Sequence, residues 1–325
     1  MIISKTPLRI SFFGGGTDIP FFSNKEFGCV LSATINKYIY LITHKSFEDK
    51  NILVYSKREE VNNVDEIQNT RIREIMKKTG VTNQIEIHSL AEVPAGTGLG
   101  SSSTFSVGLL NLLYTSKGEF ISKNQLAKEA CEIEIDILKE PIGKQDQYAT
   151  AFGGMNFIKF NTDGSVEVEP VKITDETLKK INDRLIVFYL NKSRSASDIL
   201  TKQILNVSSN EKRFEVMRKM KEISLNMKED LNNNNINYFG GRLHQSWILK
   251  KSLVDGISNS KIDDIYGRGL KAGASGGKVL GAGGGGFILF YCEPEKQEAL
   301  KRELKELREF KIQIENEGTK IIYSQ

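Results

Sequence analysis

The segment 94–103, PAGTGLGSSS, combines glycines and serines in a pattern that suits phosphate binding. Glycine permits close backbone approach and positive φ angles, so Gly96, Gly98 and Gly100 favour a tight loop. The serines precede an apolar stretch at 105–114, which we predict to be a buried helix. Free N–H groups at a helix start attract anions, and serine hydroxyls there can cap the helix or reach a phosphate-bound Mg²⁺. We predict a phosphate-binding loop, with a glycine turn and serine cap as the alternative.

Two further glycine clusters, at 14–16 and 276–286, strengthen the case for a bound anion or nucleotide. Together with the first loop they hold 13 of the 28 glycines. Neither of the common nucleotide loops is present. The Gly277-Lys278 pair lacks the serine or threonine that completes a Walker A loop. The GxGxxG pattern at 281–286 precedes a predicted strand, whereas a dinucleotide-binding loop must open a helix.

The acid–base chemistry of such a site must come from a carboxylate. His44, His88 and His244 are scattered and show no metal-ligand spacing, and no GxSxG elbow supports a serine hydrolase. The VAIK, HRD and DFG motifs of protein kinases do not follow the last glycine cluster. Asp146, in a loop-like GKQDQ segment before an apolar stretch, is therefore the leading candidate for a general base. The alternative is an aspartate that caps the next helix.

Three motifs in this chain resemble those of the GHMP kinases, the superfamily of galactokinase, homoserine kinase, mevalonate kinase and phosphomevalonate kinase. Residues 7–18 (PLRISFFGGGTD) match its first motif, the loop at 94–103 its second, and residues 278–286 (KVLGAGGGG) its third. The motifs stand in the family's order, and the resemblance runs from residue 5 to residue 291. It implies ATP- and Mg²⁺-dependent phosphoryl transfer to a small molecule. It also implies a ribosomal-protein-like N-terminal domain, a ferredoxin-like C-terminal domain and an active site between them.

Within the superfamily, residues 12–18, 140–147 (EPIGKQDQ) and 276–287 are most similar to the D-glycero-D-manno-heptose 7-phosphate kinases. Galactokinase-like members carry Gly-Glu-His-Thr-Asp where this chain has Gly-Gly-Gly-Thr-Asp, so two polar side chains of a galactose pocket are missing. The likeness implies phosphorylation of the anomeric oxygen to a 1,7-bisphosphate, for nucleotide-activated heptose and a surface polysaccharide. An L-fucose or N-acetylhexosamine 1-kinase is the enzyme alternative. A sensor that binds sugar and ATP without catalysis is the non-enzyme alternative.

The resemblance makes Asp146 the catalytic base and places Arg9, the basic residue of the first motif, beside it. A neighbouring cation keeps a carboxylate ionised and can stabilise charge on the transferring phosphoryl group. The alternative for Arg9 is a salt bridge on a strand surface. The residues expected at the ATP phosphates are Pro94, Ala95, Gly96, Thr97, Gly98, Leu99, Gly100, Ser101, Ser102 and Ser103.

The metal and sugar sites also follow from the resemblance. Mg²⁺ prefers oxygen ligands, so Ser102 and one carboxylate of the predicted helix before Asp146 are expected to hold it. Glu134 fits best, with Glu132 and Asp136 as alternatives. Lys192 and Arg194 follow a predicted strand and open a long helix, where they suit a phosphate already on the substrate, or form a charged turn. The substrate-binding residues are expected to be Asp18, Gly15, Gly16, Thr17, Lys192, Arg194, Gly283 and Gly284, although Asp18 before a proline is also a common turn former.

The elements that must position these residues mix strands and helices without strict alternation, which favours an α+β fold. We predict strands at 2–13, 29–44, 51–56, 84–90, 155–160, 166–171, 185–190 and 287–291. We predict helices at 65–78, 105–114, 123–138, 196–231, 236–253, 261–271 and 295–310. The pattern turns polar at 174–182, so we divide the chain into a nucleotide-binding, catalytic domain at 1–178 and a C-terminal domain at 179–325.

Composition excludes several classes of function. A length of 325 residues suggests about two domains. The net charge of +4, from 45 basic and 41 acidic residues, is interspersed and does not predict a nucleic-acid surface. The apolar runs are far shorter than the ~20 residues of a membrane span. Three separated cysteines and the lack of an apolar signal core predict reduced thiols in a cytoplasmic protein. The expected partners are ATP and a sugar phosphate, and a homodimer stays open.

Overall fold

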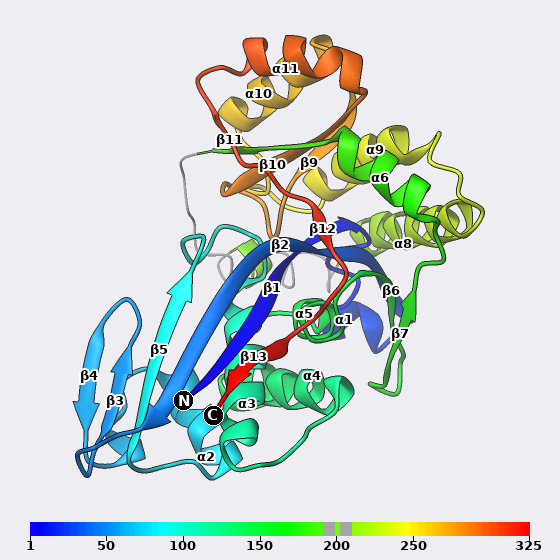
Figure 1. Cartoon of the computed structure of the whole chain (residues 1–325). Helices are drawn as coiled ribbons and strands as arrows, with labels where there is room; N and C mark the ends of the chain where they lie inside the picture. The colour runs from blue at the N-terminus through cyan, green and yellow to red at the C-terminus, as the bar shows by residue number, and fades with distance from the viewer. Residues whose placement is uncertain (191–198, 202–209) are drawn as a thin grey trace.

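The computed structural model describes residues 1–190, 199–201 and 210–325. Figure 1 shows two sheets, one above the other, with helices packed against each. In chain order the elements of the first part are β1 (Ile2–Phe13), α1 (Pro20–Ser23), β2 (Gly28–Lys45), β3 (Asn51–Val54), β4 (Arg58–Val61), η1 (Val64–Glu66), α2 (Thr70–Thr79), β5 (Ile85–Ala91), α3 (Ser101–Ser116), α4 (Lys123–Cys131), η2 (Glu132–Ile137), α5 (Gln145–Phe152), β6 (Met155–Phe160) and β7 (Val166–Pro170).

The second part contains α6 (Asp175–Arg184), β8 (Leu185–Tyr189), α8 (Glu211–Asn232), α9 (Phe239–Lys251), α10 (Ser260–Lys271), β9 (Ala274–Val279), β10 (Phe287–Cys292), η3 (Pro294–Lys296), α11 (Gln297–Glu303), β11 (Arg308–Glu309), β12 (Ile314–Glu315) and β13 (Lys320–Ser324). Among the described residues, no helix is both long enough and apolar enough to cross a membrane.

Within the described residues, the larger sheet has nine strands and is built around β1 and β2. Its main path runs β13-β1-β2-β5-β3-β4, with β12 and β6 also paired to β2, and β7 to β6. The pairing is antiparallel, except that β3 and β5 run parallel. Helix α3 packs on β1 and β2 and is buried on nearly all sides, which explains its continuous apolar sequence. This sheet and α2–α5 enclose the main hydrophobic core.

In the part of the chain that the structure describes, the smaller sheet has four antiparallel strands in the order β11-β8-β10-β9. Numbered within this sheet, the order is 4-1-3-2, the ferredoxin-like arrangement, so the predicted α+β fold is confirmed. Its core includes Phe188, Trp247, Tyr266 and Phe290. Phe12 of β1 packs against Phe239 of α9, with ring centroids 5.2 Å apart, so the start of α9 belongs to the main core.

The expected elements and the observed ones differ in three informative places. The helix predicted at 123–138 ends at Cys131 and continues as the π-helical turn η2. The helix predicted at 295–310 stops at Glu303, because the chain then pairs β11 with β8 and packs Phe310 on Phe287. Of the helix predicted at 196–231, the structure describes residues 199–201 and α8, which begins at Glu211.

The proposed division at residue 178 falls inside α6. After β11 the chain returns to the larger sheet, where β12 pairs with β2 and β13 with β1 (Figure 1). The segment 179–325 therefore contributes strands to both sheets.

Candidate active site

The loop before α3 has the backbone that its glycines predict. Gly96, Gly98 and Gly100 have φ angles of 75°, 83° and 75°, all in the left-handed region. The first bond of α3 runs from the Thr104 N–H to the Gly100 carbonyl, so the three serine N–H groups before it have no helical partner. Alternating left-handed residues turn backbone N–H groups towards a common concavity. The loop and the helix start together have the geometry that an anion site requires.

This loop is packed directly against the third glycine cluster. A Cβ on Gly98 would lie 2.4 Å from the Leu280 carbonyl oxygen, and one on Gly281 would lie 2.5 Å from the Gly98 Cα. A Cβ on Gly286 would lie 2.2 Å from the Thr97 carbonyl oxygen. The glycines of the two motifs are therefore needed because two stretches of backbone touch each other.

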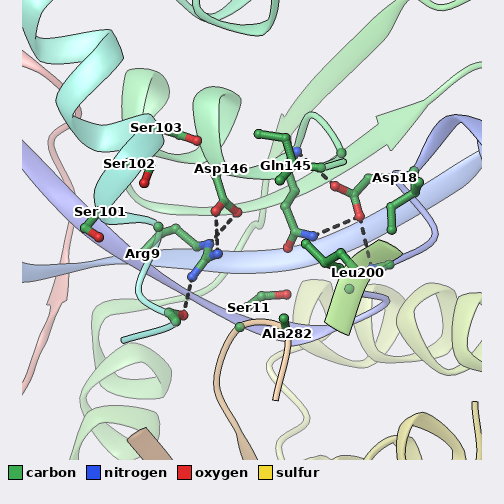
Figure 2. A pocket seen from close by; sticks show the side chains of 18 of the residues that line it. Arg9, Ser11, Asp18, Ser101, Ser102, Ser103, Gln145, Asp146, Leu200 and Ala282 are labelled. Atoms are coloured by element: carbon green, nitrogen blue, oxygen red, sulfur yellow. Dashed lines mark hydrogen bonds and ion pairs between the residues drawn. The ribbon is translucent and has the colours of Figure 1, made fainter. Parts of the chain in front are cut away.

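Arg9 and Asp146 form the charged pair at the centre of the site. Arg9 donates from Nε to Asp146 Oδ1 at 2.7 Å and from Nη2 to Asp146 Oδ2 at 2.5 Å. Its third donor, Nη1, reaches the Gly98 carbonyl at 2.8 Å. Strand β1 supplies the arginine and the first turn of α5 supplies the aspartate. Figure 2 shows this pair beside the serines that open α3. The bidentate contact fixes the direction of the carboxylate.

Asp18 lies near this pair and is held by α5. It accepts hydrogen bonds from the Gly16 N–H at 3.0 Å, the Gln145 N–H at 3.2 Å and Gln145 Nε2 at 2.8 Å (Figure 2). A Cβ on Gly143 would lie 2.0 Å from Asp18 Oδ2, so only glycine fits there. Burial raises the pKa of Asp18, and the charge on Asp146 raises it further. Hydroxyl groups that donate hydrogen bonds to the buried Asp18 carboxylate would stabilise its charge.

These groups line a cavity between the two sheets, which we call the inner cavity. Its walls include Arg9, Asp18, Asp146 and the serines 101–103, together with Ile19, Ile142 and Leu200. A second cavity of about 570 Å³, the outer cavity, adjoins it at Ser101 and Ser102. That volume lies in the ~300–1,000 Å³ range of small-molecule sites. The outer walls are largely apolar, with Ile39, Val93, Pro94, Ala95 and Phe105.

Glu134 is the carboxylate of η2 that faces the serine run. It is fully buried and accepts from Ser103 Oγ at 2.7 Å, from Ser106 Oγ at 2.6 Å and from Gln147 Nε2 at 2.5 Å. Arg71 Nη1 lies 3.3 Å from Glu134 Oε1, the oxygen that also accepts from Ser106. Burial raises the pKa of Glu134, while Arg71 and the serine donors act in the opposite direction.

The two alternative carboxylates lie elsewhere. Glu132 pairs with Lys78 at 2.8 Å on the surface, and Asp136 lines a separate pocket beside Lys144. Ser102 is exposed and borders both cavities. Among the residues that the structure describes, no group of three or more His, Cys, Asp or Glu side chains could hold a metal ion.

Several of the expected substrate residues have other contacts. Gly15 and Gly16 line the inner cavity, but the Thr17 hydroxyl donates to the Gly14 and Cys29 carbonyls and is fully buried. The third cluster contributes Gly281 and Ala282 to the cavity. The expected Gly283 and Gly284 instead contact Ile257, to whose carbonyl the Gly284 N–H donates at 2.9 Å. Lys192 and Arg194 lie outside the described residues.

Three polar residues of the site were missed by the sequence reasoning: Gln145, which anchors Asp18, Arg71, which links Glu134 to Glu140, and Lys250 of α9. A signal for Lys250 was available. Phe239, Leu243 and Trp247 form the buried face of α9, and position 250 continues that face with a lysine.

Comparison with known proteins agrees with this geometry. Residues 69–154 match the family described as "GHMP kinases N terminal domain", and residues 227–308 match "GHMP kinases C terminal". A D-glycero-alpha-D-manno-heptose 7-phosphate kinase from Campylobacter jejuni is 32% identical over 95% of this chain and 96% of its own length. The chain belongs to the GHMP kinase family. The glycine clusters at 94–103 and 276–286 lie within the two matched segments, and both contribute residues to the inner cavity.

Two other relatives of this GHMP kinase extend the comparison. The crystal structure of a D-glycero-D-manno-heptose 1-phosphate kinase from Bacteroides thetaiotaomicron superposes with a TM-score of 0.81 at 25% identity, covering 100% of both chains. A bifunctional fucokinase/GDP-fucose pyrophosphorylase from Arabidopsis thaliana is 24% identical over 95% of this chain, which spans only 32% of that protein.

Proposed function

We propose that this GHMP kinase transfers the γ-phosphoryl group of ATP to the anomeric oxygen of D-glycero-D-manno-heptose 7-phosphate, giving the 1,7-bisphosphate. The observation that carries the proposal is the Arg9–Asp146 pair, which shares one cavity with the anion site at the start of α3. An oriented carboxylate beside a phosphate site is what transfer to a hydroxyl requires. The product would serve the synthesis of nucleotide-activated heptose.

The two adjoining cavities suit the two substrates. The apolar outer cavity is the place for the nucleoside, and the serines shared by both cavities are the place for its phosphates. The sugar then occupies the inner cavity, where Asp18 accepts hydrogen bonds from the sugar hydroxyl groups. With this placement the γ-phosphoryl group lies between the helix start and Asp146.

The chemistry follows from these positions. Asp146 accepts the proton of the anomeric hydroxyl, and the sugar oxygen forms a bond to the γ-phosphorus. The bond between that phosphorus and the bridging oxygen breaks, and ADP leaves with the electron pair. Arg9 keeps both oxygens of Asp146 in place through its two donors. The α3 N–H groups stabilise the charge on the phosphate oxygens.

The residues near the serine run fit Mg²⁺, because they offer a carboxylate and hydroxyl oxygens, the donors that this ion prefers. Ser102 and Glu134 would hold it, and it would neutralise charge on the nucleotide phosphates. Glu134→Gln should therefore raise the Mg²⁺ concentration for half-maximal activity by about tenfold or more. A Mg²⁺ titration at fixed ATP measures this. An unchanged titration curve would mean that Glu134 only supports the serines.

The sugar assignment is supported by the Campylobacter relative and by the Gly-Gly-Gly-Thr-Asp form of the first motif. The names of the two heptose kinase relatives differ in where the substrate's phosphate lies, so both isomers must be tested. The decisive experiment measures ADP release with heptose 7-phosphate, heptose 1-phosphate, unphosphorylated heptose, L-fucose and N-acetylhexosamines. We expect the highest kcat/KM with heptose 7-phosphate. A preference for L-fucose or an N-acetylhexosamine would replace the assignment, and ATP binding without any turnover would indicate a sensor.

A further inference from the structure

Lys250 occupies a position where an apolar side chain would satisfy the packing of its helix. It continues the buried face of α9 and is 6% exposed, yet it lines the inner cavity. Burying an ammonium group is costly unless something compensates its charge. Its neighbour Lys251 lies on the outside and pairs with Asp263 at 2.7 Å, as an ordinary surface lysine does.

The contacts of Lys250 leave donors unused. Among the described residues, its Nζ has one hydrogen-bond partner, the Gly281 carbonyl at 2.7 Å, although an ammonium group can donate three bonds. The other cations that the structure describes in the cavity make more contacts. Arg9 forms three hydrogen bonds, to Asp146 and Gly98, and Lys278 donates to the Ser11 carbonyl at 2.6 Å and the Phe12 carbonyl at 3.0 Å.

The charges of Arg9, Asp18 and Asp146 act on Lys250. Burial, and the charge on Arg9, lower the pKa of Lys250 to about 8, while Asp18 and Asp146 act in the opposite direction. A lysine that is buried, close to a second cation and short of acceptors is stabilised by an incoming anion. Its position therefore favours a ligand that brings negative charge between Arg9 and the glycine loops.

We propose that Lys250 donates hydrogen bonds to the phosphoryl group that passes from ATP to the sugar, an inference that rests on the proposed function. The Gly281 carbonyl that it holds belongs to the loop packed on Gly98, beside the predicted phosphate site. Its charged neighbours include Arg9 and Asp146, the pair at which transfer takes place. Lys250 does not act as a base, because the acceptor proton goes to Asp146. Its contribution is charge stabilisation that is strongest in the transition state.

The test compares Lys250→Met with Lys251→Met as the matched control. Calorimetry measures the affinity for ADP and for the non-hydrolysable β,γ-imido analogue of ATP, and melting temperature monitors the fold. Lys250→Met should weaken analogue binding by roughly 10- to 100-fold, the usual scale for a lost hydrogen bond between charged groups, and leave ADP binding nearly unchanged. It should also lower kcat by about 100-fold or more. Lys251→Met should match the wild type throughout.

Lys250→Arg keeps the charge and should retain most of the preference for the analogue over ADP. This variant keeps the proposal testable if Lys250→Met does not fold. Equal loss of ADP and analogue affinity in Lys250→Met would overturn the proposal and leave Lys250 as a support for Gly281. An unchanged kcat in Lys250→Met would also overturn it. If the wild type phosphorylates none of the sugars, the proposed function fails, but the two nucleotide affinities still decide the role of Lys250.

Discussion

Replacing Asp146 by asparagine removes the base and changes its contact with Arg9. Asparagine has one amide oxygen, so one of the two Arg9 donors loses its acceptor and meets an N–H₂ group. Loss of a general base lowers turnover by about 100-fold or more. A 100-fold change corresponds to about 2.7 kcal/mol in the activation barrier. The lost charge-assisted bond should lower the free energy of unfolding by about 1.5–3 kcal/mol.

Three measurements separate these effects. ADP release at saturating ATP and sugar gives kcat, calorimetry gives the ATP affinity, and denaturant unfolding gives the stability. We expect kcat to fall as stated, with ATP affinity within about threefold of the wild type, because the base acts in the transition state. Asp264→Asn, on the exposed side of α10, is the control and should change none of them. A kcat for Asp146→Asn within about threefold of the wild type would refute the assignment.

Three further perturbations test other parts of the site. Gly98→Ala should lower both ATP affinity and melting temperature, because its Cβ would lie 2.4 Å from a carbonyl oxygen; Gly118→Ala, with a similar φ and no atom within 4 Å of the Cβ, measures the backbone strain alone. The pKa of Asp18 is higher in the folded than in the unfolded state, so the wild type loses stability as pH rises from about 4 to 7. Asp18→Asn lacks this titration, so the stability of the variant relative to the wild type should increase over this range. A pH-independent difference in melting temperature would contradict this. Arg194→Ala, outside the described residues, should raise KM for heptose 7-phosphate by roughly 10–150-fold and leave KM for ATP unchanged, whereas an equal loss with unphosphorylated heptose would place the phosphate site elsewhere.

Much of the fold was predictable where local patterns and tertiary structure agree. The strand at 2–13 matches β1 at both ends, because its apolar residues suit a strand that is buried along most of its length. The loop before α3 was predictable because three glycines at alternate positions, followed by serines, determine its backbone. The pairing of Arg9 with Asp146 followed from the family resemblance, since no local pattern connects residues so far apart.

The remaining differences arise from contacts between distant segments. No amino-acid pattern distinguishes the π-helical turn η2 from an α-helix. This turn brings Glu134 to Ser103, while Glu132 and Asp136 stay outside the site. The Lys/Glu-rich stretch after 295 has the composition of a helix, but its last residues form β11, which pairs with the free edge of β8. Lys250 was not among the predicted site residues, because its burial depends on how α9 packs on β9.

The contact between Gly98 and the Leu280–Gly281 backbone has a consequence for how the protein is made. The phosphate loop at 94–103 is synthesised well before residues 280 and 281, whose backbone packs against it. A nascent chain that stops before residue 280 has every described strand of the larger sheet except β12 and β13, and it lacks this backbone support for the loop. Since a ligand stabilises only the states that bind it, the full contribution of ATP to folding requires the contact between Gly98 and residues 280–281. ATP therefore protects the enzyme most strongly from unfolding and proteolysis once the two glycine-rich segments have packed together.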